Sequence, residues 1–247
     1  MMFTERPLPE RFPAALAAGF DTVEMLFPYE ANLADLRAAL DATGQSMALI
    51  NTPRTDWNGA AMGLAAIDGA QELFRRDLDR AVTAAGTLGA TFIHVMAGNS
   101  SGAKAHDTFL ENLDRAARNY PDQQFSIEPL SPINTPGYFL NDFDQAAGIL
   151  DDLGAANVGF QFDAFHGAMI HGDVLDLWDH HGHRAVHVQI AGPPDRAEPQ
   201  HSDLPLEEFL QRLDRDGYDG VVSGEYHPAG RTEDGLGWTD FPSRTGS

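Results

Sequence analysis

Four polar residues, each at or near the end of a short apolar run, carry the side chains best suited to chemistry in this 247-residue chain. They are Glu128 after QFSI, Asp163 at the end of VGFQFD, Gln189 in AVHVQIAG and Glu225 after GVVSG. Runs of this kind are typical of buried strands. A carboxylate buried there needs a cation, a proton or hydrogen bonds to offset its desolvation. If the strands lie parallel in one closed sheet, these side chains converge as oxygen ligands for Mg²⁺ or Mn²⁺.

The remainder of the chain alternates strand-like and helix-like segments. We expect strands at 22–27, 47–51, 91–97, 124–128, 158–163, 185–191 and 221–225, with Met1 to Phe3 as the remnant of an eighth. We expect helices at 7–18, 33–44, 68–87, 105–118, 141–153 and 205–216, with Asn32 and Asp68 at the start of two of them. This alternation implies parallel strands and right-handed crossovers. Eight repeats at this length favour a (β/α)8 TIM barrel with a truncated first strand.

Length and composition fit one domain over residues 1–247, with an irregular, glycine-rich tail from about residue 229. No apolar run approaches the ~18 residues of a membrane span, and the amino end lacks a signal-peptide pattern, so we expect a cytoplasmic protein. The absence of cysteine excludes disulfides and thiolate metal sites. The net charge of -21 argues against nucleic acid or an anionic membrane as partner. No phosphate-binding glycine motif follows a strand, so we expect no nucleotide cofactor.

Two further segments are candidates for a functional role. Residues 52–69 form a long stretch without periodicity, and loops of that length are more often functional than idle. Trp57 in this loop either plugs its base or lines the site. His180, His181 and His183 cluster just before an expected strand, at the end of the barrel opposite the chemistry, so we expect a solvated loop there rather than a metal site.

Seven blocks of sequence carry a family resemblance over nearly the whole chain. They are GFDTVEMLFPYE, NTPRTDWNGAAMGLAAI, HVMAG, the EP…PGYFLN loop, FDAFH, HVQIAGPPDRAEP and GEYHPAGRTEDGLGW. Together they resemble the hydroxypyruvate isomerase family, within the wider xylose isomerase-like barrel superfamily. The resemblance implies a metal held by the strand-end set Glu128, Asp163, Gln189 and Glu225, with the two glutamates also exchanging protons with the substrate. It places near the substrate His166, His94, His187 and Arg196.

The chain departs from that family in two places. Members have a longer first strand before the MMFTE-like segment, so this sequence either begins downstream of the usual start or has lost that strand. The loop after Glu128 carries Ser131 and Ile133 where an asparagine and an arginine are expected. A substrate carboxylate would then depend on other cations in the mouth loops, for which the candidates are Arg196, Arg54 and Arg231.

We therefore expect an isomerase that interconverts hydroxypyruvate and 2-hydroxy-3-oxopropanoate through an enediolate, at a site that holds Mg²⁺ or Mn²⁺. Its partner is a small anionic 2-oxo acid or sugar acid, and a homo-oligomer is possible. Alternatives are a 2-oxotetronate isomerase, a ketose 3-epimerase, which usually has histidine in place of Gln189, and an abasic-site endonuclease, which the acidic charge opposes. A sugar-acid binding protein is the non-enzyme alternative. It would not need Glu128 and Glu225 as a proton-transfer pair.

Overall fold

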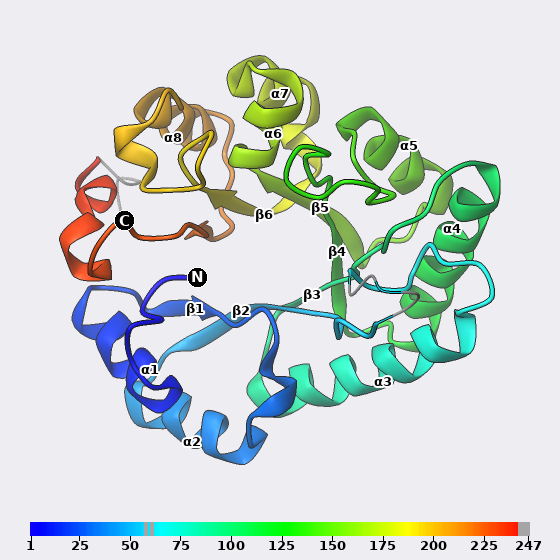
Figure 1. Ribbon diagram of the computed structural model, residues 1–247, viewed down its shortest axis with the longest axis horizontal. Coiled ribbons are helices and arrows are strands. Elements are labelled where there is room, and N and C mark those ends of the chain that lie inside the picture. The colour runs from blue at the N-terminus through cyan, green and yellow to red at the C-terminus, as the bar shows by residue number, and fades with distance from the viewer. Residues whose placement is uncertain (57–58, 60–61, 242–247) are drawn as a thin grey trace.

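The computed structural model describes residues 1–56, 59 and 62–241. Its centre is one sheet of seven parallel strands in chain order, curved into a nearly closed barrel with helices on the outside (Figure 1). The strands are β1 (Thr22–Glu24), β2 (Ser46–Asn51), β3 (Phe92–His94), β4 (Gln124–Ile127), β5 (Val158–Asp163), β6 (Ala185–Ile190) and β7 (Val222–Gly224). The α-helices are α1 (Leu8–Ala17), α2 (Leu33–Thr43), α3 (Gln71–Leu88), α4 (Ala103–Asn119), α5 (Phe143–Leu153), α6 (Ala164–His171), α7 (Val174–His181) and α8 (Leu206–Arg215). The prediction of a TIM-barrel architecture is confirmed.

Local signals explain where several helices begin and end. The Asn32 side chain accepts a hydrogen bond from the backbone N–H of Ala34 and starts α2, as predicted. Gly44 ends that helix in the left-handed conformation. The predicted cap at Asp68 is wrong, because α3 begins only at Gln71 and Asp68 forms an ion pair with Lys104 instead.

The two faces of β5 show how the barrel is built. Phe160 and Phe162 point outward and pack against rings on the helices, with Phe143 of α5 at a centroid distance of 5.3 Å from Phe160. Because side chains alternate along a strand, Gln161 and Asp163 point to the interior of the barrel. The apolar core therefore lies between sheet and helices, and the upper interior of the barrel is polar.

Two helices, α6 and α7, follow β5, where the sequence analysis predicted no helix. Asp163 and Asp173 cap them with their side chains. The prediction of a solvated loop is wrong for His181, which is buried at the end of α7, stacks on Phe160 and lies 3.3 Å from Asp144. Trp57 lies outside the described residues. No described helix combines the length and the apolar character that a membrane crossing requires.

The ring of strands is open between β7 and β1, which do not pair with each other in the described sheet. The expected strand remnant at Met1 to Phe3 is wrong. These residues form a turn in which Phe3 has a left-handed φ of 57°, and such a backbone cannot run along a strand edge. The segment nevertheless enters the gap (Figure 1), and the backbone N–H of Phe3 donates to Thr232 Oγ1 over 2.7 Å.

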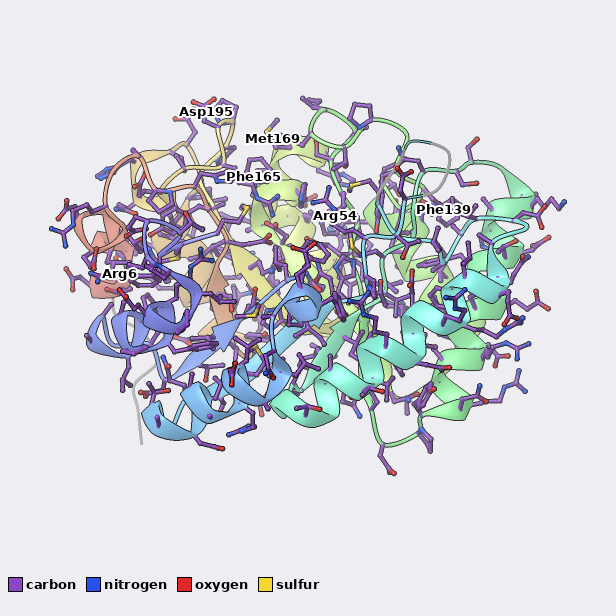
Figure 2. The ribbon with its side chains drawn as sticks, turned by 60° about the horizontal axis from the view of Figure 1, so that its bottom comes forward. Arg6, Arg54, Phe139, Phe165, Met169 and Asp195 are labelled. Carbon is purple, nitrogen blue, oxygen red and sulfur yellow. The ribbon has the colours of Figure 1, made fainter. Side chains whose placement is uncertain are left out.

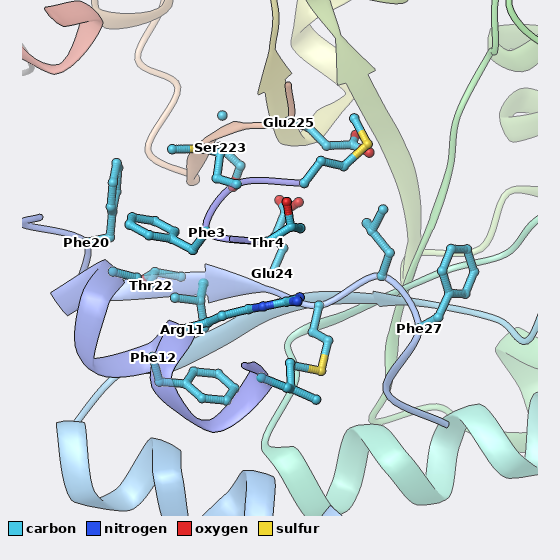
Figure 3. A pocket seen from close by; sticks show the side chains of 18 of the residues that line it. Phe3, Thr4, Arg11, Phe12, Phe20, Thr22, Glu24, Phe27, Ser223 and Glu225 are labelled. Atoms are coloured by element: carbon cyan, nitrogen blue, oxygen red, sulfur yellow. The ribbon is translucent and has the colours of Figure 1, made fainter. Parts of the chain in front are cut away.

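A pocket of about 620 Å³ occupies the gap between β1 and β7. The amino-terminal segment and α1 line its apolar part, and Glu24 and Glu225 line its polar end (Figure 3). The opening of the ring therefore reaches the strand ends where we predicted chemistry.

The long loop before α3 packs closely against the segment that follows β3, and the contact is made at Gly63. Gly63 has φ +87°, and a Cβ at this position would overlap the backbone of Met96. We expect Gly63→Ala to lower the free energy of unfolding, measured with urea, by about 1–3 kcal/mol more than Gly69→Ala. Gly69 is the matched control because it has φ +85° with open space around it. Equal losses in the two variants would show that the contact with Met96 contributes nothing.

Candidate active site

The four strand-end residues converge at the carboxyl ends of neighbouring strands. Asp163 on β5 is in register with Gln189 on β6, and the backbone N–H of Glu225 donates to Ile190 of β6 over 3.0 Å. Glu128 directly follows β4, and all four side chains are buried. In Figure 2 the labelled Met169 and Asp195, which follow β5 and β6, lie at the top of the view, so this end of the barrel is the mouth.

A chain of hydrogen bonds inside the barrel connects these residues. Ser126 Oγ donates to Gln161 Oε1 over 2.8 Å, and Gln161 Nε2 donates to Glu128 Oε2 over 3.0 Å and to Gln189 Oε1 over 2.7 Å. Gln189 Nε2 in turn donates to Glu24 Oε2 over 2.9 Å. Sequence reasoning missed Ser126, Gln161 and Glu24 as site residues. The signal that could have found them is a polar residue at every second position of an otherwise apolar strand.

Arg196 brings a positive charge to the carboxylates. It stands in the loop after β6 with a left-handed φ of 55°. Its Nη2 donates to Asp163 Oδ2 over 3.1 Å and to Glu225 Oε2 over 2.9 Å, and its guanidinium lies 5.2 Å from the centre of the Phe165 ring. The other two arginine candidates make different contacts: Arg54 lies over the Phe27 ring, and Arg231 forms an ion pair with Glu233.

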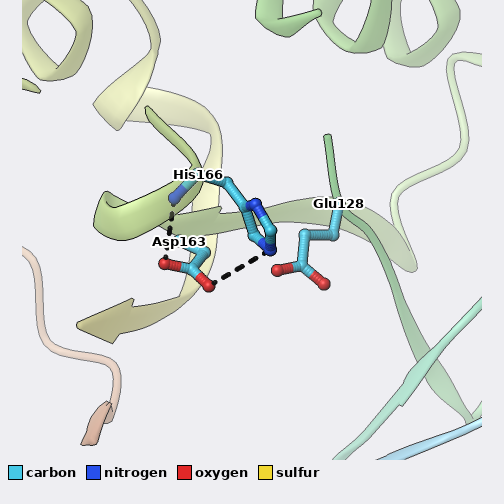
Figure 4. Close-up of side chains that lie close together, drawn as sticks. All are labelled: Glu128, Asp163 and His166. Carbon is cyan, nitrogen blue, oxygen red and sulfur yellow. Dashed lines mark hydrogen bonds and ion pairs between the residues drawn. The ribbon is translucent and has the colours of Figure 1, made fainter. Parts of the chain in front are cut away.

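The hydrogen bonding of His166 fixes which ring nitrogen carries its proton. The backbone N–H of Ser131 donates to His166 Nδ1 over 3.0 Å, so the proton of the neutral ring is on Nε2. Burial, with a contribution from Arg196, holds the pKa of His166 well below its usual range, so the ring is neutral. Nε2 lies 3.8 Å from Asp163 Oδ2, between this carboxylate and Glu128 (Figure 4). His166 is therefore arranged as a hydrogen-bond donor to the site rather than as a metal ligand.

The other two predicted histidines occupy different places. His94 Nδ1 lies 3.4 Å from Glu128 Oε2, and burial together with the neighbouring His166 lowers the pKa of His94 to about 3. His187 stands opposite Gln161, one layer below the strand ends, and its Nε2 contacts Glu24 Oε1. The structure thus brings His94 to the strand-end cluster and joins His187 to it through Glu24.

The negative charge of the buried carboxylates in the cluster is only partly compensated by the positive charge of Arg196. Burial, followed by the charges of Asp163 and Glu225, raises the pKa of Glu128 well above its usual value. Burial likewise raises the pKa of Asp163, and it raises that of Glu225 to about 7 despite the opposing charge of Arg196. Burial would also raise the pKa of Glu24, but the charge of His187 and hydrogen bonds from His187, Ser223 and Gln189 outweigh it and lower that pKa.

The cluster fits a hard divalent cation. One oxygen each of Glu128 and Asp163 and one ring nitrogen of His166 lie within 4.8 Å of one another. Glu128 Oε1 is buried and has no hydrogen-bond partner among the described residues. Because His166 Nε2 carries a proton, the oxygens available to a cation are those of Glu128, Asp163, Gln189 and Glu225, and hard cations prefer such a set.

Comparison with known proteins places the chain in a family. The model of the xylose isomerase-like TIM barrel matches residues 12–240. The chain belongs to the xylose isomerase-like TIM barrel family. Within this family, the 2-oxo-tetronate isomerase of Cupriavidus necator is 42% identical over 244 residues, which cover 96% of this chain and 94% of that protein. The hydroxypyruvate isomerase of Escherichia coli is 32% identical over 246 residues, covering 97% and 95%. The resemblance seen in the sequence blocks is confirmed, and the chain is an enzyme of the isomerase type.

Two solved structures illustrate the similarity of the fold. A protein from Brucella melitensis described as an AP endonuclease of family 2 matches with a TM-score of 0.92 at 36% identity, covering 96% of this chain and 94% of that chain. D-psicose 3-epimerase from Clostridium cellulolyticum H10 matches with a TM-score of 0.76 at 15% identity, covering 94% and 84%. At that identity the likeness concerns the fold alone.

Proposed function

We propose that the protein is an aldose-ketose isomerase of short 2-oxo acids that carry a hydroxyl group on C3, with hydroxypyruvate as the first substrate. The observation that carries this proposal is the pair Glu128 and Glu225, both buried in one cluster of oxygen donors at the barrel mouth. Two carboxyl groups there can take a proton from one carbon and return a proton to the next.

The isomerisation of hydroxypyruvate moves the carbonyl group from C2 to C3. One glutamate removes a proton from C3, and the electron pair of that C–H bond forms the C2–C3 double bond of an enediolate while the C2 oxygen gains negative charge. The other glutamate delivers a proton to C2. The proton of the C3 hydroxyl passes to the negative C2 oxygen, which leaves a hydroxyl on C2 and the aldehyde of 2-hydroxy-3-oxopropanoate on C3. General acid-base assistance of this type contributes about 10²- to 10⁴-fold.

Three groups of the site would hold the reacting atoms. His166 Nε2–H points between Asp163 and Glu128 and can donate to an oxygen that gains charge. Arg196 Nη1, which makes no hydrogen bond to the described residues, can receive the substrate carboxylate. A divalent cation held by Glu128, Asp163, Gln189 and Glu225 would supply Lewis-acid stabilisation of negative charge on the substrate oxygens.

A proton NMR time course of hydroxypyruvate in D2O tests the function, run with added Mg²⁺ or Mn²⁺ and with a chelator. We expect enzyme-dependent formation of the semialdehyde, deuterium entry at the carbon next to the carbonyl, and loss of both on chelation. Absence of turnover and of exchange under all conditions would overturn hydroxypyruvate as the substrate.

A second candidate substrate is 2-oxotetronate, favoured by the 42% identity to an isomerase named for it. The acid has the same 2-oxo-3-hydroxy arrangement and differs in having a hydroxymethyl group in place of one hydrogen on C3. The same glutamates and the same proton transfers serve both acids. The ratio of the two kcat/KM values, measured in one preparation, decides which is the better substrate.

His166→Ala is expected to lower kcat by about 10²- to 10³-fold, because it removes a preorganised donor to the developing charge. KM should change less, since the donor acts mainly when the oxygen becomes negative. His106→Ala is the control, because His106 lies on the outer helix α4 away from the cluster. Steady-state kinetics of the two variants measure the effect, and a loss of kcat below about threefold in His166→Ala would contradict the role of Nε2.

A further inference from the structure

Glu24 is a buried carboxylate that the proposed proton transfers do not use. It stands at the end of β1, its side chain is 9% exposed, and it reaches across the open side of the barrel to β6. Its two oxygens have separate partners: Oε1 contacts His187 Nε2, and Oε2 accepts the hydrogen bond of Gln189 Nε2. Figure 3 shows the Glu24 side chain rising from β1 toward the segment that carries Glu225.

The hydrogen-bond chain through the barrel has only one consistent direction. Gln161 Oε1 is an acceptor, so the Ser126 hydroxyl must donate to it, and the Gln161 amide nitrogen then faces Glu128 and Gln189. Gln189 meets that nitrogen with its oxygen and presents its own nitrogen to Glu24. Each amide thus has its oxygen against a donor and its nitrogen against an acceptor.

Turning the Gln189 carboxamide over would create two unfavourable contacts. Its nitrogen would face the nitrogen of Gln161, and its oxygen would face the carboxylate of Glu24. Because Gln161 and Gln189 are buried and the Glu24 side chain is only 9% exposed, each mismatch would carry most of the cost of an unsatisfied polar group. Glu24 therefore selects the orientation in which the Gln189 oxygen is on the side of Glu128. A carbonyl oxygen has two lone pairs, so the one not bonded to Gln161 can serve a cation.

We propose that Glu24 is a positioning residue, which holds Gln189 with its oxygen turned toward the strand-end cluster without itself touching the cation. This inference rests on the proposed function, because it assumes that the cluster binds a divalent cation. Outer partners of this kind orient metal ligands in many proteins, and their loss costs about 10- to 100-fold in metal affinity.

The test is a double-mutant cycle on Mn²⁺ affinity, measured from the electron paramagnetic resonance signal of free Mn²⁺. Four proteins are compared: the native chain, Glu24→Leu, Gln189→Ala and the double variant. Leucine is used because it has no acceptor for Gln189 Nε2, whereas glutamine would still accept this hydrogen bond. If Glu24 acts by orienting Gln189, its replacement weakens Mn²⁺ binding about 10- to 100-fold in the native background. In the Gln189→Ala background, the factor by which replacement of Glu24 raises the Kd for Mn²⁺ should be at least about fivefold smaller. A difference below about fivefold between the two backgrounds overturns the proposal.

A second variant separates position from charge and guards against misfolding. Glu24→Asp keeps the negative charge but shortens the reach to Gln189, so we expect a loss of Mn²⁺ affinity close to that of Glu24→Leu. Native affinity in this variant overturns the proposal. Glu198→Leu is the matched control, since Glu198 is also buried and accepts a hydrogen bond, from Ala229, outside the cluster. Thermal unfolding of every variant shows whether it is folded.

Failure of the proposed function gives a different result. A native chain that neither binds Mn²⁺ nor exchanges protons of hydroxypyruvate would overturn the isomerase proposal together with this inference. A native chain that does both, while Glu24→Leu and Glu24→Asp bind Mn²⁺ as tightly, would overturn the role of Glu24 alone.

Discussion

Glu128→Gln is expected to lower kcat by about 10²- to 10⁴-fold, with the fold preserved. Glutamine has nearly the shape of glutamate and can still accept from Gln161 Nε2, but it cannot exchange a proton with a carbon atom. The same change at Glu225 should have an effect of the same order. The measurement is the proton NMR time course in D2O, which follows product formation and deuterium entry separately.

The two readouts also assign the roles of the glutamates. The variant that lacks the base should show neither exchange nor product, whereas the variant that lacks only the proton donor should still exchange the C3 proton while product formation slows. Glu111→Gln on the exposed face of α4 is the control for a general effect of lost charge. Near-native turnover by Glu128→Gln would exclude a proton-transfer role for this residue.

Arg196→Met is expected to lower the free energy of unfolding by about 3–5 kcal/mol, because it leaves buried Asp163 and Glu225 without their shared cation. For a domain of this size that corresponds to a fall in Tm of roughly 6–20 °C. The loss should shrink as the pH falls, since removal of Arg196 raises the folded-state pKa of both carboxyls further above their unfolded values. The penalty is present where they would be ionised and disappears below the unfolded pKa.

Urea unfolding at several pH values, with and without Mn²⁺, measures this prediction. The cation should stabilise Arg196→Met more than the native chain, because it replaces the missing positive charge. Arg212→Met is the control: Arg212 pairs with the half-exposed Asp179 on the surface, and such pairs contribute less than about 1 kcal/mol. A loss in Arg196→Met no larger than in this control would show that Arg196 does not compensate the cluster.

The strands could be predicted because their outer faces are strongly apolar. In β5 the alternation of Phe160 and Phe162 with Gln161 and Asp163 gave the bounds of the strand and the position of the carboxylate. Alternation shows that a strand has two faces but not what each face meets. Gln161 and Glu24 were missed for that reason, since their partners come from strands distant in the sequence.

The remaining errors depend on local geometry that residue types do not determine. Asp68 is a good capping residue by type, but its side chain turns to Lys104, which is 36 positions away in the sequence. The turn at Phe3 has a left-handed backbone at a residue that seldom adopts one. The segment AFHGAMIH of α6 is apolar on nearly all sides, so it shows no helical period.

The opening between β7 and β1 has a consequence for the motions of the barrel. Six neighbouring strand pairs are joined by backbone ladders, whereas the described contacts from β1 to β6 across the gap are side-chain bonds of Glu24 to His187 and Gln189. Local unfolding starts where backbone hydrogen bonds are fewest, so we expect transient opening of the barrel between β7 and β1. The same side chains border the strand-end cluster. Binding of a cation or substrate in that cluster should therefore reduce the opening between β7 and β1.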